Sequence, residues 1–402
     1  MLEAALRSGT AGRRAAFEVF TRGLPPGRRF GVFAGLGRLL DALDTFRFGP
    51  AEIAWLEARK VVSDATLQWL EGFRFSGDID AYAEGDLYAP GSPVLTVEST
   101  FAEAVLLETL VLSILNHDSA VAAAASLIVA AAGGRPVIEM GSRRTDPESA
   151  VAAARAAYLA GFAATSNLEA GRRYGVPTAG TSAHAFVLSF PDEEAAFAAQ
   201  VAALGSATTL LVDTFDAGEG IRRAIAAAGP SLAAIRIDSG DLAEEARMAR
   251  ALLDSLGAHR TKVIVTGDLD DAKIRALAAA PADGYGAGTS VVTGLGHPTS
   301  GLVYKLVSVD GAPVAKQSPG KATIGGRKWA WRVPSRGEDV VGTSPAGAPT
   351  GGRALQVRVV ASGERLGGPA LADSRAFHQV VLAEHPPGRA LVTSPRPSVP
   401  RA

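Results

Sequence analysis

The feature that most constrains the fold of this chain is a regular alternation of short β-like runs with alanine-rich helical segments between about residues 135 and 290. The β-like runs fall at residues 137–139, 162–164, 176–179, 208–213, 233–238, 262–266 and 284–288, and the helical segments at 149–159, 192–204, 218–228, 243–256 and 270–279. Strands that alternate with helices of this length form parallel βαβ units. Closed on themselves, such units form an α/β barrel, which we expect for this part of the chain.

The sequence on either side of this region follows other patterns. Upstream, residues 50–71 have helical spacing and residues 72–93 are interrupted by Gly and Pro; downstream, apolar residues alternate with a period of two at 302–309 and 355–360, which predicts strands. We therefore expect an N-terminal α+β region at 1–100, an α/β barrel at 101–300, a β-rich region at 301–385 that packs with the N-terminal region, and a disordered tail rich in Pro, Arg and Ser at 386–402.

The apolar stretch at residues 121–132 consists mostly of Ala and is too short for a membrane span, which needs about 20 residues. Together with the apolar residues 101–115, it predicts two buried helices that lead into the barrel. The first ten residues lack an apolar core followed by a cleavage site, so we expect no secretory signal.

Charge and cysteine content exclude several classes of protein. With 40 basic and 41 acidic residues, the chain has no overall field that would attract nucleic acid or an anionic membrane, and we expect neither as a partner. It has no Cys, which excludes disulfides, thiolate nucleophiles and Cys-ligated metal sites. Nothing requires an oxidising compartment, and we expect a cytoplasmic protein.

Polar residues gather where the predicted strands end, which is where ligands bind in parallel α/β folds. Asp213, Asp238 and Asp268 follow three different strands. Carboxylates that converge there suit a cationic sugar centre, ribose hydroxyls or Mg²⁺. The alternative for each Asp is that it caps the next helix. No motif for a resident metal ion, such as HExxH, occurs.

Two loops rich in small residues are candidates for phosphate binding and for catalysis. The segment GAGTS at residues 286–290 offers backbone N–H groups unobstructed by side chains, which suits a phosphate, although a Gly-rich turn is often only a turn. His184 lies in the loop GTSAH. A His in this position is either catalytic or a structural, hydrogen-bonded residue.

Arginines mark the same edge of the predicted sheet. Arg143 and Arg144 follow the first strand and suit a carboxylate or phosphate, unless they form surface ion pairs with Asp146 and Glu148. Arg236 interrupts an apolar strand. A buried charge there needs an anionic partner, which is either a ligand or a neighbouring Asp.

Taken together, these loops resemble nicotinate phosphoribosyltransferases. The resemblance extends from about residue 1 to residue 332, and its segments are FEVFTRGLP (17–25), GSPVLTVE (91–98), LETLVLSILNH (107–117), EMGSRRT (139–145), GFAATSNLEAGRRYGVPTAGTSAHAF (161–186), LVDTFD (211–216), IRIDSGDL (235–242) and YGAGTSVVTG (285–294). It implies a type II phosphoribosyltransferase fold, in which an irregular α/β barrel accompanies a second α+β domain built from both chain ends. It also implies a head-to-tail homodimer.

The resemblance further implies an enzyme of the glycosyltransferase and ligase type. Nicotinate would attack C1 of 5-phosphoribosyl 1-diphosphate and give nicotinate mononucleotide and diphosphate, a step of NAD salvage. ATP hydrolysis would be coupled through a phosphohistidine, and His184 is the matching position. The added phosphoryl charge would reorganise the site for diphosphate and Mg²⁺.

The roles of the base-binding residues are carried over from the same motifs. Arg143 would face the nicotinate carboxylate, Thr181 would hydrogen-bond the base, and Arg236 would lie near the base and the phosphates. Amide-using relatives usually have an acidic residue where this chain has Ser166 and Asn167. The absence of a carboxylate there favours the acid, nicotinate, over the amide.

The roles of the sugar- and phosphate-binding residues follow in the same way. Asp213 and Asp238 would position the ribose and stabilise its oxocarbenium-like charge. The ribose hydroxyls and the 5-phosphate would be bound by Gly267, Asp268, Gly288 and Thr289.

The chain departs from the family pattern at two places. The family begins with a segment like TDLYxLTM, whose Tyr stacks on the pyridine ring, and Met1 corresponds to the end of that segment. Either the start lies too far downstream, or the chain is a catalytically weak subunit that dimerises with a complete paralogue. At Gly267 we would expect a hydroxyl residue. A quinolinate phosphoribosyltransferase is the other enzyme considered, but its basic pocket should need more Arg and Lys than these loops supply.

Overall fold

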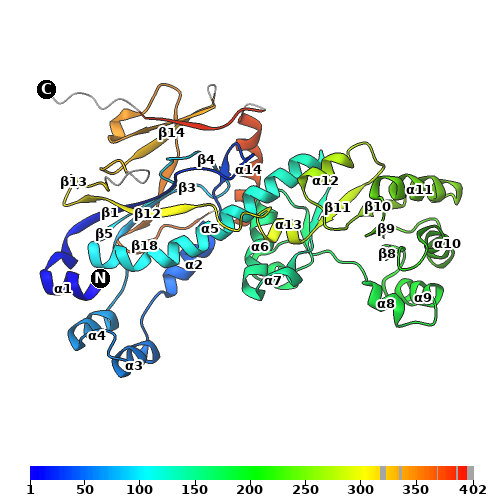
Figure 1. Cartoon of the computed structure of the whole chain (residues 1–402), viewed down its shortest axis with the longest axis horizontal. Helices are drawn as coiled ribbons and strands as arrows, with labels where there is room; N and C mark the ends of the chain where they lie inside the picture. The colour runs from blue at the N-terminus through cyan, green and yellow to red at the C-terminus, as the bar shows by residue number, and fades with distance from the viewer. Residues whose placement is uncertain (317–322, 335–336, 369, 386–387, 396–402) are drawn as a thin grey trace. The chain divides into compact units, whose positions relative to one another are not determined.

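The computed structural model describes residues 1–316, 323–334, 337–368, 370–385 and 388–395 (Figure 1). The chain forms two compact units. The barrel unit consists of Val121–Pro298, and the terminal unit combines Met1–Ala120 with Thr299–Ala402.

The barrel unit contains a parallel six-stranded sheet in the order β7-β6-β11-β10-β9-β8. Its strands are β6 (Val137–Glu139), β7 (Ala164–Thr165), β8 (Thr209–Leu211), β9 (Ala234–Ile237), β10 (Lys262–Val265) and β11 (Gly284–Ala287). The order ends in β7 and β8, so within the described residues the sheet is a half-barrel that is open between these strands. The α/β prediction is thereby confirmed.

Helices follow the strands of this sheet, as the alternation predicts. They are α6 (Pro147–Leu159), α7 (Leu168–Tyr174), α8 (His184–Leu188), α9 (Glu193–Leu204), α10 (Ala217–Ala228), α11 (Leu242–Ser255), α12 (Asp271–Ala276) and α13 (Thr289–Val292). In Figure 1, α11 runs beside β9 and β10, which it contacts. The prediction of a strand at residues 176–179 is wrong. Within this range only Thr178 forms a β-bridge, an isolated one to Thr165.

The prediction of two buried helices before the barrel is also wrong, because α5 is a single helix over Phe101–Ala132. Its polar centre does not interrupt it, because Ser119 donates to the carbonyl of Ala34 and Asp118 pairs with Arg38. By length and composition α5 could cross a membrane, but 61% of its most apolar window is buried inside the protein. It is a core helix.

The terminal unit is built from both chain ends, as expected. Its main sheet has the order β13-β12-β1-β5-β3-β17-β18, and all its neighbouring strands pair antiparallel. The strands are β1 (Arg14–Thr21), β3 (Asp78–Tyr82), β5 (Leu95–Thr100), β12 (Leu302–Val309), β13 (Ala312–Pro313), β17 (Gln356–Ala361) and β18 (Glu364–Arg365). In its core Phe17 stacks on Tyr304, so residues from opposite ends of the chain share one hydrophobic cluster.

A second sheet of this unit has the order β16-β14-β15-β19. Its strands are β14 (Trp329–Val333), β15 (Glu338–Gly342), β16 (Arg353–Ala354) and β19 (Val392–Pro395), and β2 (Gly31–Val32) pairs separately with β4 (Leu87–Tyr88). The structure differs here from the expected disordered tail, because β19 pairs parallel with β15. Residues 386–387 and 396–402 of that tail lie outside the described residues.

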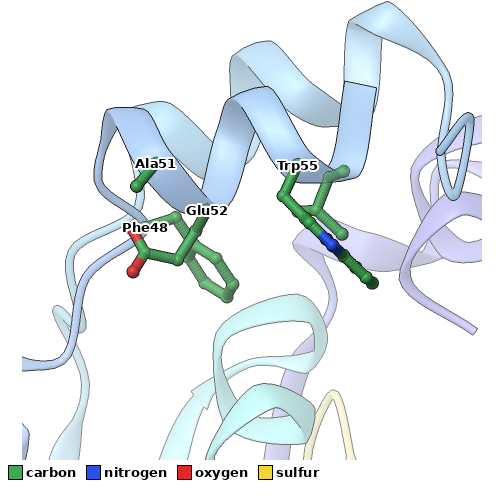
Figure 2. Close-up of a pocket in the computed structure, with 5 residues that line it drawn as sticks. Phe48, Ala51, Glu52 and Trp55 are labelled. Atoms are coloured by element: carbon green, nitrogen blue, oxygen red, sulfur yellow. The ribbon is translucent and has the colours of Figure 1, made fainter. Parts of the chain in front are cut away.

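The helices of the terminal unit, besides the first part of α5, are α1 (Leu2–Ser8), α2 (Leu36–Thr45), α3 (Pro50–Ala58), α4 (Asp64–Glu71) and α14 (Leu371–Glu384). An open, apolar cavity of about 400 Å³ lies against α3 and is lined by Phe48, Ala51, Glu52, Trp55 and Leu56. Figure 2 shows the rings of Phe48 and Trp55 pointing away from the helix on the same side. Ile53, on the same helix, packs against α4 instead.

Candidate active site

A cavity of about 280 Å³ lies at the carboxyl ends of the parallel strands. Five of the predicted site residues line it: Arg143, Thr181, His184, Arg236 and Asp238. The other five, Asp213, Gly267, Asp268, Gly288 and Thr289, follow strands of the same sheet but are not part of this lining.

Arg236, on β9, is the centre of the hydrogen-bond network in this cavity. Its Nε atom donates to Thr266 Oγ1 (2.8 Å), Nη1 to Thr181 Oγ1 (2.8 Å) and Nη2 to Asp238 Oδ1 (2.7 Å). The anionic partner of this half-buried guanidinium is therefore the neighbouring Asp238. Sequence reasoning missed Thr266, although a hydroxyl residue at the end of an apolar strand is a detectable signal.

Asp238 faces Arg236 with one oxygen and His184 with the other. Burial alone would raise the pKa of Asp238, but the hydrogen bonds from Thr266 and Arg236 and the nearby His184 outweigh it, so the pKa is lowered. His184 Nε2 lies 3.9 Å from Asp238 Oδ2. A carboxylate held ionised in this way suits the stabilisation of positive charge.

Asp213 lies just beyond β8 and contacts the loop after β9. Its Oδ2 accepts from the N–H of Asp238 (2.7 Å) and from the hydroxyl of Ser239 (2.9 Å). Its Oδ1 is buried, and no described residue hydrogen-bonds to it. One carboxylate oxygen is therefore left for a ligand. The role of Ser239 was not predicted.

His184 is the first residue of α8, and each of its ring nitrogens faces a polar side chain. Nδ1 lies 3.2 Å from Thr214 Oγ1, while Nε2 is directed to Asp238. The side chain is 41% exposed, so a reactant can reach it. Thr214 is a further residue that sequence reasoning missed.

Helix capping does not account for the three candidate aspartates. The helices that follow them are capped by other residues: Asp216 accepts from the N–H of Glu219, Asp241 from those of Ala243 and Glu244, and Asp270 from that of Lys273. The capping alternative is therefore excluded for Asp213, Asp238 and Asp268.

Arg143 and Arg144 belong to the short 3₁₀ helix Ser142–Arg144 and are exposed. Their expected surface partners are engaged elsewhere, because Asp146 caps α6 and Glu148 pairs with Arg173. Neither Arg143 nor Arg144 makes an ion pair within the described ranges. Arg143 therefore has its guanidinium available at the cavity.

The two glycine-containing loops lie close to the backbone of neighbouring strand ends. Gly267 has φ +115°, and a Cβ there would lie 2.6 Å from the carbonyl oxygen of Asp238. A Cβ at Gly288, at the start of α13, would lie 3.1 Å from the carbonyl oxygen of Met140. Thr289 and Asp268 are exposed next to these glycines. Both loops therefore keep their backbones against the neighbouring strand ends.

Comparisons with known proteins show which family the chain is similar to. The model of the nicotinate phosphoribosyltransferase N-terminal domain matches residues 1–116, and the model of the nicotinate phosphoribosyltransferase family matches residues 136–337. Nicotinate phosphoribosyltransferase pncB1 of Mycobacterium tuberculosis is 61% identical over 340 residues, which cover 83% of this chain and 75% of that protein.

Two solved structures are similar to the whole chain. The crystal structure of human nicotinic acid phosphoribosyltransferase has a TM-score of 0.85 at 27% identity and covers 98% of this chain and 96% of its own. Nicotinate-nucleotide pyrophosphorylase from Pyrococcus furiosus has a TM-score of 0.79 at 24% identity, with 95% and 92% covered, a likeness that concerns the fold. The chain belongs to the nicotinate phosphoribosyltransferase family and is an enzyme of NAD salvage.

Proposed function

We propose that the cavity at the carboxyl ends of β6 and β9 is where this enzyme joins nicotinate to the ribose, with ATP hydrolysis coupled through His184. The observation that carries the proposal is that Arg143, His184 and the Arg236–Asp238 pair line one cavity. An anionic base, a ribose and a phosphate need such groups within reach of one another.

Nicotinate would bind with its carboxylate at the Arg143 guanidinium, which has no ion-pair partner in the described part of the chain. A guanidinium binds a carboxylate through two parallel hydrogen bonds. Thr181 and Arg236 lie on the same cavity wall and would contact the ring. Ser166 also lines the cavity, and its uncharged side chain does not repel the nicotinate anion.

The ring nitrogen of nicotinate would attack C1 of the ribose as the bond from C1 to diphosphate breaks. The carboxylates of Asp213 and Asp238 would stabilise the positive charge that develops on the sugar. Asp268 with Gly267 would bind ribose hydroxyls, and Gly288 with Thr289 the 5-phosphate.

Mg²⁺ would be held with the diphosphate by the carboxylates of Asp213 and Asp238. The buried and unpartnered Oδ1 of Asp213 fits this role, because Mg²⁺ binds carboxylate oxygens. When bound, the ion would neutralise charge on the leaving diphosphate. Asp213 would meanwhile keep the N–H of Asp238 in place.

ATP would transfer its γ-phosphoryl group to the ring of His184, with release of ADP, and water would later remove that group. A phosphoryl group adds about −1.5 to −2 charges. Close to Asp238, this charge would attract Arg236 away from its present carboxylate partner. The ion pairs at the site would then differ between the phosphorylated and the unphosphorylated enzyme. In this way ATP hydrolysis would alter the affinity for the substrates, although the phosphoryl group does not enter the product. The family resemblance further supports a homodimer in the cytoplasm.

The test is the formation of nicotinate mononucleotide from nicotinate and 5-phosphoribosyl 1-diphosphate, with and without ATP. We expect His184→Ala to keep a basal rate and lose the stimulation by ATP. His259→Ala is the matched control, because His259 is exposed and contacts Asp254 away from the cavity. Stimulation that persists in the His184→Ala variant would refute the phosphohistidine. Product from a chain extended upstream alone would keep the function, whereas no product from either chain would favour the weak-subunit alternative.

A further inference from the structure

Glu139, the last residue of β6, is a buried carboxylate for which the proposed reaction has no use. It is 1% exposed, and burial raises its pKa although two hydrogen bonds oppose that shift. In the parts of the chain that the structure describes, no Lys, Arg or His pairs with it. Burial of a carboxylate without a cationic partner costs stability, and a role within the site would account for that cost.

The two oxygens of Glu139 connect two different loops. Oε1 accepts from the N–H of Gly141, in the loop that leads to Arg143. Oε2 accepts from the hydroxyl of Thr165 (2.5 Å), at the end of the neighbouring strand β7. Thr165 Oγ1 in turn accepts from the N–H of Asn167 (3.0 Å).

A further bond links the two loops directly. Asn167 Nδ2 donates to Ser142 Oγ (3.0 Å), so the two loops are joined by this bond as well as through Glu139. Ser142 and Arg143 of one loop, and Ser166 of the other, line the cavity. Glu139 and Thr165 do not line it and are each 1% exposed.

The loop after β6 has little room to settle elsewhere. A Cβ at Gly141 would lie 2.4 Å from Val292 Cγ1 and 2.8 Å from the carbonyl oxygen of Gly288. The backbone at Gly141 is therefore closely surrounded by Gly288, by Val292 of α13 and by the carboxylate of Glu139.

We propose that Glu139 is a positioning residue for nicotinate, which sets the spacing between Arg143 and Ser166 across the cavity. The inference rests on the proposed function, in which the nicotinate carboxylate meets Arg143. Glu139 acts through the loops and does not touch the base. Because that contact exists in the bound substrate and in the transition state alike, loosening it raises KM for nicotinate and leaves kcat unchanged.

The test uses Thr165→Val, which keeps the shape of the side chain but removes the hydroxyl that ties Glu139 to Asn167. We expect KM for nicotinate to rise about tenfold, which corresponds to one hydrogen bond, with kcat and KM for 5-phosphoribosyl 1-diphosphate within about twofold. Thr165→Ser keeps the hydroxyl and restores the original KM. Glu139→Gln, with one acceptor oxygen instead of two, is the second variant and raises the same KM.

Thr261→Val is the matched control. Thr261 is also 1% exposed and donates to the carbonyl of Leu232, before the start of β10 and away from the cavity. Its loss should lower the melting temperature without changing either KM. If Thr165→Val and Thr261→Val change KM for nicotinate and KM for 5-phosphoribosyl 1-diphosphate by the same factors, the hydrogen bond of Thr165 has only a structural role. That result would overturn the inference.

Arg143→Ala separates this inference from the function on which it rests. If KM for nicotinate rises in that variant, and Thr165→Val adds nothing in the Arg143→Ala background, Glu139 acts through Arg143. If the two effects add fully, Glu139 is not a positioning residue for that contact, although the base site stands. If Arg143→Ala leaves KM for nicotinate unchanged, the proposed base site is wrong and the inference fails with it.

Discussion

At the scale of single residues, backbone geometry explains why position 267 carries no side chain. The family resemblance makes a hydroxyl residue the expected choice there. With φ +115°, however, a Cβ at Gly267 would lie 2.6 Å from the backbone carbonyl oxygen of Asp238, whose side chain is at the centre of the site. Backbone atoms cannot rotate away as a flexible side chain would. In this chain the loop after β10 approaches Asp238 too closely for any side chain.

Gly267→Ser should therefore impair both stability and activity. We expect a loss of about 1–3 kcal/mol in the free energy of unfolding from the strained backbone, together with a raised KM for 5-phosphoribosyl 1-diphosphate, because Asp238 is displaced. Urea denaturation and steady-state kinetics measure the two effects.

Gly257→Ser is the control for this change. Gly257 also has a positive φ (+76°), but a Cβ added there would have no atom within 4 Å. The variant should lose about 1 kcal/mol from backbone conformation and keep its kinetics. Equal kinetics in the two variants would show that the close approach to Asp238 has no consequence.

At the scale of elements, the carboxylate that caps the start of a helix is either adjacent to the helix in sequence or distant from it. In the barrel unit the caps are local, as in α10, which Asp216 precedes. In the terminal unit, a residue distant in sequence accepts the hydrogen bonds at the start of α4. Glu3 of α1 accepts from the N–H of Ser63 (2.8 Å) and from the hydroxyls of Ser63 (3.0 Å) and Thr66 (2.9 Å). These bonds lower the pKa of Glu3 to about 2.

The contribution of Glu3 to stability should depend on pH. Its pKa lies below the ordinary value of 4.5, so the stabilisation is fully present above about pH 4.5 and is lost as the pH falls toward 2. Glu3→Gln should thus lower the denaturation midpoint at pH 7 and approach the unaltered chain in acid. Glu57→Gln, at an exposed position of α3, is the control. A difference that stays constant between pH 7 and pH 3 would contradict the capping role.

At the scale of the whole molecule, a buried ion network joins the two ends of the chain within the terminal unit. Arg332 of β14 donates through Nε to Asp339 Oδ1 (2.8 Å) and through Nη1 to Asp86 Oδ1. Arg353 donates to Asp86 Oδ2 (2.9 Å). Both carboxylates are fully buried. Asp86 precedes β4, so residues more than 240 positions apart depend on each other's charge.

Arg332→Met should cost about 3–5 kcal/mol in the free energy of unfolding, because it leaves two buried carboxylates without their shared cation. Arg275→Met is the control, since it breaks an ion pair with Asp271 in which Arg275 is 60% exposed, and should cost less than about 0.5 kcal/mol. Urea denaturation of both variants measures the difference. Similar losses would mean that burial does not decide the strength of this network.

The sequence alone determined the class of the barrel unit and the neighbourhood of the site. Apolar periodicity depends on residues within four positions of each other, so the strands β8 to β11 and the helices α9 to α11 fall where the pattern predicts them. Parallel strands place their carboxyl ends at one edge, so Arg143 after β6 and Asp238 after β9 could be assigned to one site from the pattern of strands. His184 lines the same cavity, although the strand predicted before it does not form. The roles given to these residues remain predictions.

Only the tertiary structure decided which side chains meet. Arg236 bonds to Thr181, 55 residues away, and Glu139 to Thr165, 26 residues away, and no local pattern specifies either pair. The same holds for α5, which continues through its polar centre because Ser119 finds a buried partner in the loop before α2. Local pattern sets the element, whereas packing between distant segments decides where each buried polar group is satisfied.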